Sequence, residues 1–111
     1  MKYLTLISFL LALIADARAG RVIPPERYDH EFAGEVIHTE MPNEAKLRKI
    51  CEGFGSVFTQ SKALGCAFAY RGKCFIFTVP YIDMLYSNTG VEMIMRHERA
   101  HCNGWAPNHP D

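Results

Sequence analysis

Apolar residues recur at helical spacing after Pro42-Asn43-Glu44. The stripe consists of Leu47, Ile50, Cys51 and Phe54, at positions i, i+3, i+4 and i+7 of one helix face. The polar residues before it suit a helix start, and Gly53 and Gly55 favour its end. This pattern predicts one amphipathic helix in the first half of the chain.

Two apolar, aromatic-rich runs flank a glycine turn further along the chain. Ala63–Tyr70 and Cys74–Val79 lie on either side of Arg71-Gly72-Lys73, and Pro80 ends the second run. Runs of this length around such a turn predict an antiparallel β-hairpin. Tyr81–Tyr86 is a short apolar connector whose form the pattern leaves open.

The pattern is weaker before the first helix. Residues 20–34 are polar, contain Pro24-Pro25 and show no periodicity, so we expect an extended and loosely held lead-in. Residues 35–39 predict a short strand.

A second helix is expected near the C-terminal end of the sequence. Thr89 and Glu92 match the capping box, in which their side chains bind free backbone N–H groups. We therefore expect a helix over about 90–103. Gly104 suits the left-handed position after a helix, and Pro107 prevents continuation. Together the elements predict a small single α+β domain with one N-terminal helix, a short antiparallel sheet and a C-terminal helix.

The first residues resemble a secretory signal peptide. Met1-Lys2 gives a positive start, Tyr3–Ala15 is an apolar run, and Ala17-Arg18-Ala19 has the small-x-small pattern of a cleavage site. The run is shorter than the roughly 20 residues that a membrane span needs, although a buried or anchoring helix is the alternative. We expect cleavage after Ala19 and export. The resulting division is a signal peptide over 1–19, an extended segment over 20–40 and a folded domain over 41–111.

The charge balance bears on the kind of partner, and the cysteine content bears on disulfide formation. Twelve basic and twelve acidic residues leave no positive surplus for phosphate backbones, so no nucleic-acid partner is expected. An exported domain of this size often depends on disulfides. The four cysteines are Cys51, Cys66, Cys74 and Cys102, which permit three pairings.

The length of the hairpin turn bears on this pairing. With a two-residue turn, Cys66 and Cys74 point to opposite faces of the sheet and cannot bond, whereas a three-residue loop puts them on one face. We prefer Cys51–Cys66 with Cys74–Cys102, and the other pairings stay open. A zinc site built from four cysteines is the alternative, but no C-x-x-C pair supports it.

The candidate chemistry lies in His97-Glu98-Arg99-Ala100-His101. Residues four apart share a helix face, so His97 and His101 can bind one metal ion, while Glu98 can hold a metal-bound water. This composition would produce H-E-x-x-H by chance in roughly one to two chains per hundred. The helical context, Gly104 and a further histidine at His109 reduce that risk. We predict Zn²⁺ bound by His97, His101 and His109, with Asp111 as a weaker oxygen ligand.

These residues resemble the metal helix of the zincin metallopeptidases. The extension H-E-x-x-H-x-x-G is similar to the branch whose third histidine usually comes six residues after the second, which is Pro107 here. This chain offers His109 instead, and Arg99 and Asn103 also differ from that branch. A closer likeness is to small exported bacterial proteins, mostly uncharacterised, with H-E-x-x-H-C-N-G-W and a following histidine. The specific resemblance is confined to residues 96–110, and the folded domain over 41–111 is accordingly expected to be a minimal zincin-like metal-binding domain.

The resemblance implies zinc-dependent hydrolysis of peptide bonds, with Glu98 as general base. Three protein ligands leave a position for water, whose pKa falls from 15.7 towards about 7. A peptide or protein substrate would lie along the edge of Cys74–Val79 or Ala63–Tyr70. The oxyanion donor is one of Tyr70, Tyr81, Tyr86 and Arg96.

Two other functions are compatible with the same residues. One is a non-catalytic, zinc-stabilised binding or assembly module of a bacterial envelope or secretion complex, and the other is a cell-wall amide hydrolase. In each case we expect a periplasmic or secreted protein without a membrane span after cleavage.

Four other residues are expected to have no part in the chemistry. Arg99, His30 and His38 should lie at the surface, and Trp105 should pack the C-terminal loop onto the helix.

Overall fold

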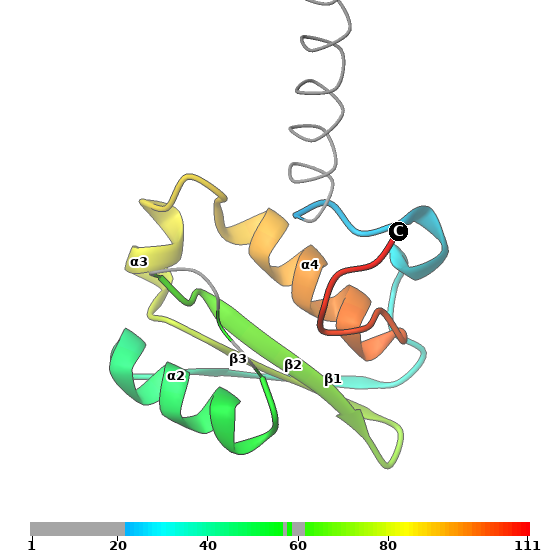
Figure 1. Cartoon of the computed structure of the whole chain (residues 1–111), viewed down its shortest axis with the longest axis horizontal. Helices are drawn as coiled ribbons and strands as arrows, with labels where there is room; N and C mark the ends of the chain where they lie inside the picture. The colour runs from blue at the N-terminus through cyan, green and yellow to red at the C-terminus, as the bar shows by residue number, and fades with distance from the viewer. Residues whose placement is uncertain (1–21, 57, 59–61) are drawn as a thin grey trace, which may run out of the picture.

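The computed structural model describes residues 22–56, 58 and 62–111, so the predicted signal peptide and its cleavage site lie outside the described residues. Among the residues described, no helix is long and apolar enough to cross a membrane. The elements are a short 3-10 helix η1 (Glu26–Tyr28), strands β1 (Glu35–Glu40), β2 (Gly65–Tyr70) and β3 (Lys73–Thr78), and helices α2 (Glu44–Gly53), α3 (Tyr81–Leu85) and α4 (Val91–Cys102). The α+β prediction is confirmed (Figure 1).

The three strands form one sheet in the order β1-β3-β2. β2 and β3 are the predicted antiparallel hairpin, in which Tyr70 pairs with Lys73 across a two-residue turn. Arg71 and Gly72 both have positive φ, which a tight hairpin turn between twisted strands requires.

β1 joins the sheet parallel to β3, so the sheet is mixed and the expectation of a purely antiparallel sheet is wrong. The order of the strands in the sheet follows from how apolar their side chains are. β3 is apolar on both faces and takes the central position, where Cys74, Ile76 and Thr78 are buried. β1 carries Glu35, His38 and Glu40 and lies at an edge, where charged residues are tolerated.

Two disulfides attach the helices to opposite faces of the sheet. The two-residue turn puts Cys66 and Cys74 on opposite faces, and the pairs are Cys51–Cys66, from α2 to β2, and Cys74–Cys102, from β3 to α4. The preferred pairing is therefore confirmed, and the four-cysteine zinc site is wrong. The larger core cluster contains Leu47, Cys51, Ala63, Cys66, Val79, Met84 and Ile94.

The predicted start of α2 agrees with the structure, whereas the cap predicted for α4 does not form. α2 begins after Asn43, whose side chain accepts a hydrogen bond from the Lys46 backbone N–H. The capping box predicted for α4 is not formed. Gly90, with φ +83, is the N-cap residue and provides no side chain, so Thr89 is one residue too early to cap the helix. The connector after Pro80 folds as α3, and Gly104 is left-handed after α4, as predicted.

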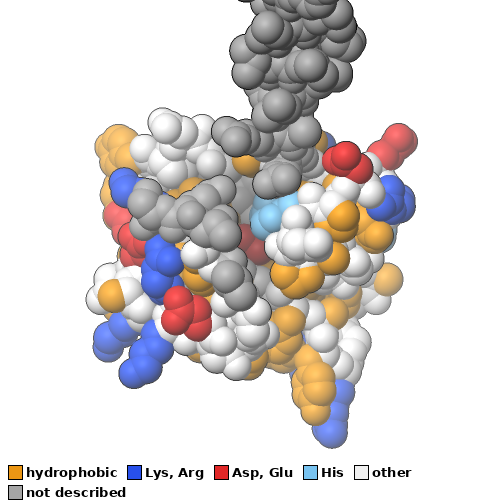
Figure 2. Space-filling view, in the orientation of Figure 1, with side chains coloured by type: hydrophobic (Ala, Val, Ile, Leu, Met, Phe, Trp, Pro, Cys, Tyr) orange, Lys and Arg blue, Asp and Glu red, His pale blue; other side chains and the backbone are white. Residues whose placement is uncertain are grey.

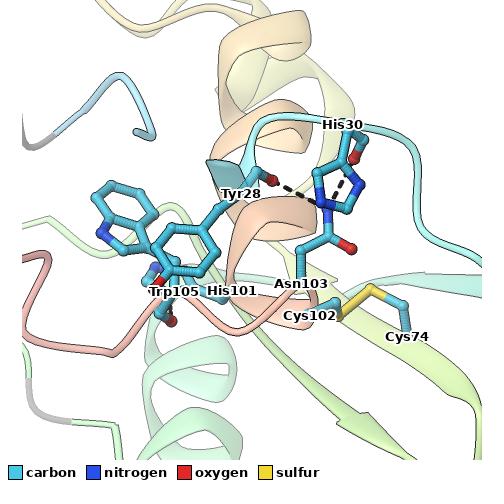
Figure 3. Close-up of a disulfide and its surroundings, with 7 residues drawn as sticks. All are labelled: Tyr28, His30, Cys74, His101, Cys102, Asn103 and Trp105. Carbon is cyan, nitrogen blue, oxygen red and sulfur yellow. Dashed lines mark hydrogen bonds between the residues drawn. A yellow bond between two sulfur atoms is a disulfide. The ribbon is translucent and has the colours of Figure 1, made fainter. Parts of the chain in front are cut away.

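The lead-in over the described residues 22–34, which we call the N-terminal strap, is not loosely held as expected. Asn103, directly after α4, donates hydrogen bonds to the backbone carbonyls of Tyr28 and His30 (Figure 3), and Arg96 of α4 binds Asp29. The sequence shows no periodicity here because polar side chains of α4 hold the strap, together with Phe32, which packs against the smaller core cluster.

Candidate metal centre

The structure brings the three predicted ligands together. His97 and His101 lie one turn apart on α4, and His109 approaches from the loop that follows the helix. The Nε2 atoms form a small triangle, with separations of 3.0 Å for His97–His109, 3.1 Å for His101–His109 and 3.3 Å for His97–His101. All three side chains are partly exposed, and Figure 2 shows histidine surface within a hollow on this face. This group can hold a metal ion.

The triangle has the size that a tetrahedral zinc site requires. Zinc–nitrogen bonds of about 2.0–2.1 Å at tetrahedral angles put neighbouring nitrogen atoms roughly 3.3 Å apart. The three separations lie at or slightly below this value. Little rearrangement is therefore needed for all three imidazoles to bind one ion.

The hydrogen bonds on the other ring nitrogens determine which tautomers are present. His97 Nδ1 donates to the Val22 carbonyl and His101 Nδ1 to the Trp105 carbonyl, each at 2.8 Å. A carbonyl only accepts hydrogen bonds, so both rings carry their hydrogen on Nδ1 and expose the Nε2 lone pair. Burial lowers the pKa of both histidines, which keeps the rings neutral at neutral pH. Two lone pairs that face each other repel unless a cation lies between them.

Trp105 forms a wall that all three imidazoles share. Its ring centroid lies 4.9 Å from those of His97, His101 and His109, and its side chain is 2% exposed. Its indole N–H donates to the Pro110 carbonyl at 2.7 Å, which closes the loop that carries His109. The predicted packing of this loop onto the helix is confirmed. The contact with every ligand was not foreseen, because ring contacts across a loop leave no spacing signal.

Glu98 lies in the middle of the core-facing stripe of α4, between Ile94 and Cys102. Its side chain is 6% exposed, and burial raises its pKa to about 8. The carboxylate packs against the start of β2, where a Cβ built on Gly65 would lie 3.1 Å from Oε2. A buried carboxyl in an apolar stripe is costly for stability, and such groups concentrate at functional sites. A divalent cation nearby would favour its ionised form.

The remaining candidates are mostly engaged elsewhere. Arg96 binds Asp29, and Tyr70 lies at the hairpin turn beneath Arg71. Among the residues described, the group that could hold a metal ion consists of the three histidines and does not include Asp111. Tyr81 and Tyr86 lie at α3 and are exposed.

His30 and His38 lie at the surface, as expected, and each is hydrogen-bonded outside the metal centre. His30 Nδ1 donates to the Glu31 carbonyl, and His38 is hydrogen-bonded to the buried Thr78 hydroxyl. Arg99, expected to be solvated, is partly buried and donates to Glu31 at 3.1 Å.

Comparisons with known protein families, with curated proteins and with solved structures give no match. The two disulfides are consistent with an exported location in an oxidising compartment.

Proposed function

We propose that this protein is an exported, zincin-like metallopeptidase in which His97, His101 and His109 hold Zn²⁺ and Glu98 is the general base. The observation that carries the proposal is the triangle of Nε2 atoms within 3.0–3.3 Å, with a buried carboxylate on the neighbouring residue of the same helix. A purely structural zinc site has no need of that carboxylate. The disulfides favour a periplasmic or secreted location.

The chemistry follows from the roles of the residues. A zinc ion with three protein ligands supplies a Lewis acid and a bound water whose pKa falls towards about 7. Glu98 accepts a proton from the attacking water and returns it to the leaving amine. Burial alone raises the pKa of Glu98 to about 8, and a bound cation would favour the ionised form that accepts the first proton.

The sheet offers one strand for a substrate beside α4. β3 is paired on both sides, whereas β2 is an edge strand that packs against α4 through Gly65 and Glu98. An extended peptide can add to such an edge by backbone hydrogen bonds. Of the two strands that the sequence left open, we therefore propose β2 for the substrate.

A test compares Glu98→Gln with Glu92→Gln, an exposed glutamate in the first turn of α4. Bound zinc is counted first, and chelator-sensitive cleavage of a peptide library is measured next. We expect one zinc per chain in all three proteins and a loss of about 10²- to 10⁴-fold in cleavage for Glu98→Gln alone. Equal cleavage by both variants would contradict the role of Glu98.

The second candidate is a zinc-stabilised assembly module without turnover. It is favoured by exposed apolar side chains at α3, which are Tyr81, Ile82, Leu85 and Tyr86. Stoichiometric zinc without chelator-sensitive cleavage of peptides or of cell-wall amides would favour this candidate. Cleavage of the amides alone would keep the residues in their roles and change the substrate.

A further inference from the structure

The N-terminal strap runs along a face of α4 that is separate from the ligand face. Arg96, Arg99 and Asn103 are spaced at i, i+3 and i+7, and each binds the strap. Arg96 Nε lies 2.8 and 2.9 Å from the two carboxylate oxygens of Asp29. The strap is therefore fastened to successive turns of the helix that carries His97 and His101.

The strap also holds the loop that carries His109. Arg27 donates a hydrogen bond to the backbone carbonyl of Asp111 at 2.7 Å. The Tyr28 ring lies beside Gly104, where a Cβ would be 3.6 Å from Cε1 of the ring. Both segments that supply ligands thus contact the same strap.

The first described residue of the strap contacts a ligand directly. The Val22 carbonyl accepts the hydrogen bond from His97 Nδ1 at 2.8 Å. The Val22 side chain is 38% exposed and outside the core clusters, so the contribution of this residue to the centre comes from its backbone.

We propose that Val22 is a positioning residue of the metal centre, and that the N-terminal strap completes the centre from a distant part of the chain. The Val22 carbonyl keeps the hydrogen of His97 on Nδ1 and turns the Nε2 lone pair towards the other two ligands. This inference rests on the proposed zinc binding. Partners of this kind change metal affinity by about 10- to 100-fold. A chain trimmed beyond Val22 would retain every ligand and still bind zinc more weakly, so proteolysis within the strap would regulate the site.

Three forms of the protein test this inference, beginning at Gly20, Val22 and Ile23. The form that begins at Val22 is the matched control, because it has lost two residues and still has the carbonyl. Zinc affinity is measured by competition with a chromophoric chelator, and the ligand geometry by the visible spectrum of the Co²⁺-substituted protein. Thermal unfolding in chelator reports the stability of the metal-free fold.

We expect zinc affinity to fall about 10- to 100-fold, with an altered Co²⁺ spectrum, only in the form that begins at Ile23. Equal affinity in all three forms would overturn the role of Val22, whereas no zinc binding by any form would overturn the proposed function itself. If the form that begins at Ile23 does not fold, the variant Asp29→Ala is measured in its place. It loosens the strap by removing the ion pair with Arg96, and it keeps the Val22 carbonyl. Weakened zinc binding by Asp29→Ala supports the inference, and undiminished affinity overturns it.

Discussion

Gly65→Ala tests the contact between α4 and the sheet at the position of Glu98. A Cβ at residue 65 would lie 3.0 Å from the Phe77 carbonyl oxygen and 3.1 Å from Glu98 Oε2. The carbonyl belongs to the central strand and is held by pairing on both sides. The Glu98 carboxylate must therefore move by a few tenths of an ångström.

The expected change in the free energy of unfolding is the balance of two opposing effects. Crowding in a packed interior costs about 1–3 kcal/mol. Replacing glycine stabilises by about 0.4–1 kcal/mol, because the unfolded chain loses conformational freedom. We expect a net destabilisation of about 1–2 kcal/mol, with Tm lower by about 4–8 °C for each kcal/mol. A displacement of 1 Å can cost about 100-fold in rate, so a shift of a few tenths should reduce peptide cleavage about 3- to 10-fold.

The measurements are urea unfolding and the rate of peptide cleavage by the zinc-loaded protein. Gly53→Ala is the matched control, since residue 53 is the last of α2 and a Cβ there meets nothing within 4 Å. If Gly65→Ala is as stable and as active as the unmodified chain, Glu98 does not pack against β2 as described.

Four further predictions concern the centre and its supports. His109→Ala should weaken zinc binding by more than the roughly 100-fold typical of outer partners, and Asp111→Ala, measured by the same chelator competition, should not. Trp105→Phe removes the hydrogen bond to the Pro110 carbonyl and should destabilise the protein by about 1–2 kcal/mol in urea unfolding; unchanged stability would contradict this. A protein kept in free zinc at 1,000 times the Kd should lose about 4 kcal/mol of stability when a chelator removes the zinc. Thermal unfolding should show this loss as a lower Tm. Arg96 lowers the pKa of Asp29 below 3.8 by hydrogen bonding, so their ion pair stabilises the fold above that pH and is lost as pH falls through the lowered pKa. We expect Asp29→Asn to be less stable than the unmodified chain at neutral pH. In an acid titration of the unfolding free energy, a difference that does not narrow as pH falls below 3.8 would contradict this prediction.

Features encoded by short-range patterns were predictable from the chain alone. The stripe that begins at Leu47 and the two apolar runs around Arg71-Gly72 identified α2 and the hairpin. Leu47 and Cys51 of the stripe are buried, whereas Phe54 is the C-cap residue and is 53% exposed. The two-residue turn excludes a Cys66–Cys74 bond, whereas the choice between the two remaining pairings depends on how α2 and α4 pack against the sheet. The spacing of His97 and His101 located two ligands, since helical geometry alone brings residues four apart onto one face.

Long-range packing decided what no local spacing contains. The parallel pairing of β1 with β3 depends on which strand has two apolar faces to bury, and the attachment of the strap depends on α4 side chains about 70 positions away in the chain. His109 was a candidate by proximity, but only the closed loop around Trp105 brings its Nε2 within 3.1 Å of the other two. The sequence by itself determined α2, the hairpin, α4 and the chemistry available, but not η1 or α3. The tertiary structure decided which distant polar groups meet, because the hydrogen bonds of Val22 with His97 and of Asn103 with Tyr28 each join residues 75 positions apart.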